Sequence, residues 1–144
     1  MRINTKAREP ARAELTALPR VNPVIVEALT NMLRDDSGAK KPPRSSAALL
    51  ALIRALNRAN LPFPTRARAA QHVNISVDTI DASLSRMLSQ GYLDERVEVL
   101  PGNVKQRASV LRAKIYTLNP RVRAVADSAE KTLRGSEAVA RARA

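Results

Sequence analysis

Residues 74–100 read NISVDTIDASLSRMLSQGYLDERVEVL, and this stretch decides the expected fold. Its apolar side chains recur at the spacing of one face of a helix, which is expected to pack into a core. These side chains are Val77, Ile80, Leu84, Met87 and Leu88. Ser76 is suited to cap the start of this helix, and Gly91 is suited to end it in a left-handed conformation.

The segments on either side add a second helix and a hairpin. Residues 66–73 predict a helix of about two turns with Thr65 as its N-cap. Residues 92–100 and 110–118 are rich in Val, Ile, Leu, Tyr and Thr, and Pro101, Gly102 and Asn103 interrupt them. They therefore predict a β-hairpin. A helix, a tight turn, a helix and a hairpin in this order are typical of a winged helix-turn-helix, a shape that fits the major groove of DNA.

The whole chain is expected to form one mainly α domain with a small β-hairpin, in which N- and C-terminal helices flank the winged helix-turn-helix. Residues 1–20 read as a basic mobile arm, and residues 21–44 as a short helix over 21–34 followed by a linker. Residues 45–120 form the winged helix domain, whose first helix over 46–60 is expected to be capped by Ser46. Residues 121–144 predict a helix to about Leu133 and, after Gly135, a frayed tail.

The stretch ISVDTIDASLSRMLSQGYLDER resembles the MarR family of bacterial transcription regulators. The resemblance lies in the polar turn, the apolar Ile80 and Leu84, Arg86, the ending at residues 88–91 and the charged strand that follows. It covers roughly residues 46–126, because YTLNPRVRAV is similar to the family's last wing strand and closing helix. The family implies a homodimer on a pseudo-palindromic operator, often with a small-molecule pocket, for which this chain offers no residues.

The charge of the chain agrees with a nucleic-acid partner. The formal net charge is +12 in 144 residues and the isoelectric point is near 11.3. Basic residues gather in residues 1–20 and in residues 40–60, the second of which has no acidic residue. Such a balance is the electrostatic footprint of DNA binding, although ribosomal and membrane-surface proteins share it.

Other classes of protein find little support in the composition. The chain has no cysteine, and no apolar run is long enough to cross a bilayer. We expect a cytoplasmic protein of the nucleoid that has no membrane partner and no cofactor. His72 is the single histidine, and no cysteine or carboxylate cluster accompanies it, so no metal site and no catalytic residue are predicted.

The predicted DNA contacts fall into two sets. The exposed N-terminal part of the second helix offers Ser76, Asp78, Thr79, Ala82, Ser83 and Arg86. The surroundings offer basic side chains for phosphates, which are Arg66, Arg68, Lys105, Arg107, Arg112 and Lys114. The helix has no Arg, Asn or Gln in its first two turns, so direct base reading is weak. Asp78 and Asp81 either complement the helix dipole or accept from the amino group of cytosine.

Three classes of function agree with the sequence. The favoured one is sequence-directed binding of double-stranded DNA by a homodimeric transcription regulator, with the flanking helices 21–34 and 121–133 as the dimer interface. The alternative is a plasmid or phage accessory factor for replication or partition, or a nucleoid-associated silencer, that reads phosphates and shape. A protein-interaction module is the third class. An enzyme is not expected, and the effector ligand is unknown.

Overall fold

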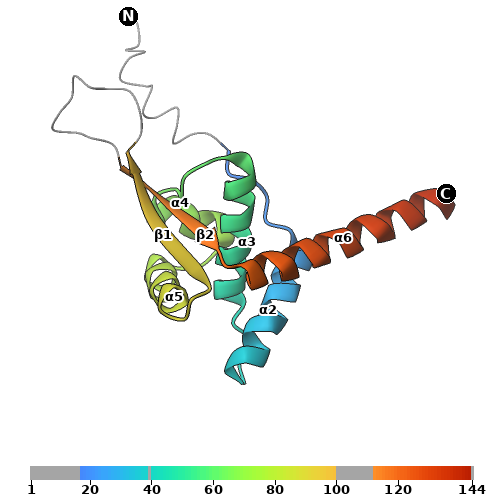
Figure 1. The fold of residues 1–144 in the computed structure, drawn as a ribbon, viewed down its shortest axis with the longest axis horizontal. Coiled ribbons are helices and arrows are strands. Elements are labelled where there is room, and N and C mark those ends of the chain that lie inside the picture. Colours follow the sequence, from blue (N-terminus) through green and yellow to red (C-terminus); the bar gives the residue numbers. More distant parts are fainter. Residues whose placement is uncertain (1–16, 39, 100–111, 144) are drawn as a thin grey trace, which may run out of the picture.

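The computed structural model describes residues 17–38, 40–99 and 112–143, and these residues form a mainly helical fold with one small antiparallel sheet (Figure 1). This confirms the expected mainly α class. The elements in chain order are α2 (Pro23–Ser37), α3 (Arg44–Ala59), α4 (Arg66–Val73), α5 (Val77–Ser89), β1 (Leu93–Val99), β2 (Arg112–Leu118) and α6 (Pro120–Arg143).

Helix α3 is the centre of the core and contacts α2, α4, α5 and β2. Leu49, Leu50 and Leu52 are fully buried, so its apolar side chains do not form a single stripe. A helix that is apolar on most sides is stable only when other elements surround it. The other buried side chains come from α2, α4, α5, both strands and the first turns of α6, and they include Leu29, Ile80, Leu93, Tyr116 and Val122.

Helices α4 and α5 begin and end where the sequence predicts. The Thr65 hydroxyl accepts from the N–H of Arg68 at 3.3 Å, and the Ser76 hydroxyl accepts from the N–H of Thr79 at 3.1 Å. Between the helices, Asn74 takes the left-handed conformation with φ 57°, and its N–H bonds the carbonyl of Ala70. Gly91 follows α5 with φ 82°, as expected of a residue that stops a helix.

The sheet is a two-stranded antiparallel ladder in which Leu93 pairs with Leu118 and Val97 pairs with Lys114. Leu93, Tyr116 and Leu118 are buried near the start of β1, whereas Val97 is 51% exposed. The hairpin is therefore anchored in the core at one end and extends beyond it at the other. The predicted turn at residues 101–103 lies outside the described residues.

Helices α2 and α6 pack on each other and on the central helix, as part of one core. Ile25, Leu29, Val122 and Ala126 are all buried in that core. The core therefore buries these four side chains, whereas Val24 at the start of α2 is 41% exposed. The assignment of the two helices to a dimer interface stays a prediction.

Three details of the expected fold are wrong. The tail after Gly135 is not frayed, because α6 continues to Arg143 through an Ala- and Arg-rich segment of high helix propensity. Helix α3 begins at Arg44, so Ser46 lies inside its first turn and does not cap it. The end of the predicted arm is held, since Leu18 packs against the core and the Pro19 carbonyl lies 2.8 Å from Nε2 of His72. Residues 1–16 lie outside the described residues.

Among the described helices, none is both long enough and apolar enough to cross a membrane.

Candidate nucleic-acid interface

Helix α5 presents the exposed face that the sequence assigned to DNA. Ile80, Leu84 and Met87 are buried against the core, whereas Asp78, Ala82 and Arg86 are exposed. The exposed side chains follow each other at helical spacing, so the face runs along the helix. Its first two turns carry carboxylates and an alanine, and no side chain that usually pairs with guanine or adenine.

Two predicted positions on α5 prove to be wrong. Ser83 was expected to face outwards, but it is 1% exposed, and its hydroxyl accepts from Nη2 of Arg86 at 3.5 Å. Ser83 is thus buried within the chain, beside Thr79 and Arg86 at the edge of a cavity. Val77 was expected in the core but is 40% exposed, because it is the first residue of the helix.

The hydroxyls at the start of α5 bond to each other. The Ser76 and Thr79 hydroxyl oxygens lie 2.7 Å apart, and Ser76 also caps the helix. Ser76 therefore has a structural role at this corner. Its side chain is nevertheless exposed, and Thr79 is half-buried.

Arg66, a predicted phosphate contact, is already engaged within the fold. Its Nε donates to Oδ1 of Asp81 at 2.6 Å, which joins α4 to α5. Its guanidinium also lies 5.5 Å from the centre of the Phe63 ring, and that ring packs edge-on against Tyr116 of β2 at 5.2 Å. Asp81 therefore has a specific partner that neither sequence interpretation included. Arg66 ties α4, α5 and the hairpin together.

The remaining predicted contacts lie on α4, on β2 or outside the described residues. Lys114 is exposed on β2, and Arg68 is half-buried in the first turn of α4. Arg112 is the first residue of β2. Lys105 and Arg107 lie outside the described residues, so their assignment to the tip of the hairpin stays a prediction.

The basic segment at residues 40–60 has less unpaired positive charge than its composition suggests. Arg54 on α3 is 7% exposed, and its guanidinium bonds Asp127 at 2.8 Å and Glu130 at 3.2 Å on α6. Arg58 bonds the same Glu130 carboxylate at 2.6 Å. The hydrogen bonds from Arg58 and Arg54 lower the pKa of Glu130 to about 2. Arg54, Arg58, Asp127 and Glu130 are hereafter called the Arg54 cluster. Its two carboxylates neutralise the charge of its two arginines.

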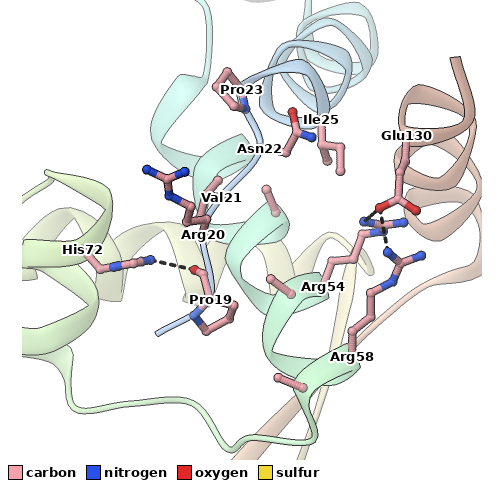
Figure 2. Close-up of a pocket in the computed structure, with 13 residues that line it drawn as sticks. Pro19, Arg20, Val21, Asn22, Pro23, Ile25, Arg54, Arg58, His72 and Glu130 are labelled. Atoms are coloured by element: carbon pink, nitrogen blue, oxygen red, sulfur yellow. Dashed lines mark hydrogen bonds and ion pairs between the residues drawn. The ribbon is translucent and has the colours of Figure 1, made fainter. Parts of the chain in front are cut away.

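The Arg54 cluster borders a pocket of about 1030 Å³ (Figure 2). The opposite wall is the segment that leads into α2, including Pro19 and Val21, and His72 closes one side through its contact with the Pro19 carbonyl. In the described part of the chain, no group of three or more His, Asp or Glu residues could hold a metal ion. Two of the arginines that line the pocket, Arg54 and Arg58, are thus already paired.

Two basic residues that the sequence did not assign to the site lie beside α5. Lys41 and Arg44 border a cavity that Thr79 and Arg86 also line. The sequence signal was the segment KKPPR, residues 40–44, which precedes a helix without an acidic residue in its first turn. Its place beside α5 depends on the packing of α3 on α5.

Comparison with protein-family models finds no match for this chain, and comparison with curated proteins finds no significant match.

Proposed function

We propose that the chain binds double-stranded DNA as a winged helix-turn-helix protein, with α5 in the major groove and the β1–β2 hairpin as the wing. The observation that carries this proposal is the exposed face of α5 on a helix pair that is capped at both starts and followed directly by a hairpin. Winged helix proteins use this order of elements to bring a helix and a wing to DNA. The resemblance to the MarR family supports a bacterial transcription regulator.

A second candidate is a replication or partition accessory factor, or a silencer, that reads phosphates and DNA shape. It is favoured by the acidic start of α5, where Asp78 lies in the first turn and Asp81 holds Arg66. Such a helix offers few contacts to base edges, so affinity comes mainly from the surrounding cations. A protein-interaction module is the third candidate.

Binding to a short duplex, followed by fluorescence anisotropy at rising salt, tests the proposal. A DNA-binding protein that neutralises several phosphates loses affinity steeply between about 50 mM and about 200 mM salt. Lys105→Ala with Arg107→Ala should weaken binding to most sequences alike. A flat salt dependence would sink the DNA proposal, and an unchanged affinity of the double variant would remove the wing from it.

The regulator and the accessory factor are separated by footprinting on DNA around the chain's own gene. A regulator protects a short palindrome, whereas a silencer protects long or diffuse stretches. Homodimer formation through α2 and α6 stays a prediction. Sedimentation at high micromolar concentration measures it, and a monomer there contradicts a dimer.

A further inference from the structure

A cavity of about 670 Å³ lies beside α5, next to the face that we propose for DNA. Its walls are the C-terminal end of α2, the segment that leads into α3, the first turn of α3 and one side of α5. Polar and cationic side chains dominate the part near α3 and α5, and they include Lys41, Arg44, Ser45, Ser46, Thr79 and Arg86.

The N-terminus of α3 borders this cavity without a side-chain cap. Pro43 occupies the N-cap position and makes no side-chain hydrogen bond, and the first turn has no acidic residue. The amides of Ser45 and Ser46 belong to the first turn, whose N–H groups a helix leaves without an intrahelical acceptor. Together with the helix dipole, they favour an anion at this position.

Ser46 gives a second and independent sign of a ligand. It is only 7% exposed, and it lines the cavity. Its hydroxyl makes no hydrogen bond to any described residue. Since no fully enclosed side-chain oxygen or nitrogen of the described chain lacks a partner, this hydroxyl must be accessible, and the accessible space that Ser46 borders is the cavity. A hydroxyl in this position can donate to a ligand in the cavity.

The charges around the cavity are those of an anion site. Lys41 has no ion pair among the described residues, and Arg44 has only a 3.8 Å contact with Glu27 in which both side chains are exposed. Asp36, the acidic residue of the wall, is already bound by Arg121 and by Tyr92, which also lines the cavity. The cationic charge of Lys41, Arg44 and Arg86 is therefore left largely unbalanced.

We propose that this cavity binds a phosphate group, held by the first-turn amides of α3, the Ser46 hydroxyl and Lys41. Because Thr79 and Arg86 line the cavity and also belong to the predicted DNA contacts on α5, the source we favour is a backbone phosphate of bound DNA. This choice of source rests on the proposed function, whereas the phosphate site itself does not. A free phosphate compound is the other source of the same chemistry.

The first experiment titrates the ¹⁵N-labelled protein with inorganic phosphate and follows its amide NMR signals, with chloride at matched ionic strength as the reference. We expect saturable shifts at Ser45 and Ser46 with phosphate and none with chloride. Lys41→Ala with Ser46→Ala should raise the dissociation constant by about tenfold, the effect of losing charge-assisted hydrogen bonds. The matched control is Lys131→Ala with Ser128→Ala, two exposed positions on α6. Shifts that are absent, or equal with chloride, overturn the site.

The second experiment measures duplex DNA binding by the same two double variants. The Lys41 and Ser46 variant should bind several-fold more weakly than the control, and its salt slope should fall by about one. If phosphate binds at the site but the two variants bind DNA equally, a DNA phosphate is overturned as the source and a free phosphate compound takes its place. If neither variant nor the wild type binds DNA, the proposed function fails while the phosphate titration still decides the site.

Discussion

Replacing Asp127 and Glu130 together, by Asp127→Asn and Glu130→Gln, leaves the guanidinium of Arg54 without a carboxylate partner among the described residues. The Arg54 side chain is 8% exposed, so its charge cannot regain full hydration in the folded state. Removing the partners of a buried charge costs about 3 kcal/mol or more of the free energy of unfolding. Glu130→Gln alone should cost less, about 1–2 kcal/mol, since Asp127 still bonds Arg54 at 2.8 Å.

Urea unfolding followed by circular dichroism measures these losses. With an m value of about 1.5 kcal/mol per molar urea, the double variant should lower the midpoint by roughly 2 M. Glu27→Gln is the matched control, because its only ion pair with a described residue is the 3.8 Å contact with Arg44, and it should cost less than about 0.5 kcal/mol. A double variant as stable as the control would refute the packing of α6 on α3.

Three further outcomes follow from named residues. Glu130 and Asp36 have pKa values lowered to about 2, so their ionised carboxylates stabilise the folded state fully above about pH 5 and lose this effect as the pH falls towards 2. The difference in urea midpoint between the wild type and Glu130→Gln should therefore shrink over that range. A constant difference would contradict the assignment. Asn74→Ala should lower the free energy of unfolding by about 1 kcal/mol, whereas Asn74→Gly should stay within about 0.5 kcal/mol of the wild type, because φ at this position is 57°. Equal losses would argue against a left-handed residue. Leu49→Ala should cost about 2–5 kcal/mol in urea unfolding against less than about 0.5 kcal/mol for Val97→Ala, and similar values would place Leu49 outside the core.

The sequence predicted the elements whose signals are local. Thr65 and Ser76 cap the helices they directly precede, and Gly91 follows α5 in the left-handed conformation, so each boundary depends on a few neighbouring residues. Alternating and helical spacings likewise fixed the strands and the core face of α5. The helix pair and the hairpin were therefore predictable to within a few residues at each end.

Contacts between distant segments were not predictable in this way. Arg54 meets its carboxylates on α6 across more than 70 positions of sequence, so nothing near it indicates burial. Ser83 follows the polar pattern of α5 but is buried, and a hydroxyl alone does not distinguish the buried side from the exposed one. The cavity beside α5 was missed for the same reason, because Lys41 and Arg86 come together only in the folded chain.

The C-terminal part of α6 projects from the body of the fold (Figure 1). The helix continues beyond Glu130, which Arg54 and Arg58 hold, to Arg143. At 1.5 Å per residue, this outer part is a rod of about 20 Å. The Arg54 cluster holds the base of this outer part, and α3, which carries Arg54 and Arg58, also packs on α5. The outer part of α6 is therefore connected, through the Arg54 cluster and α3, to the helix that we propose for the major groove.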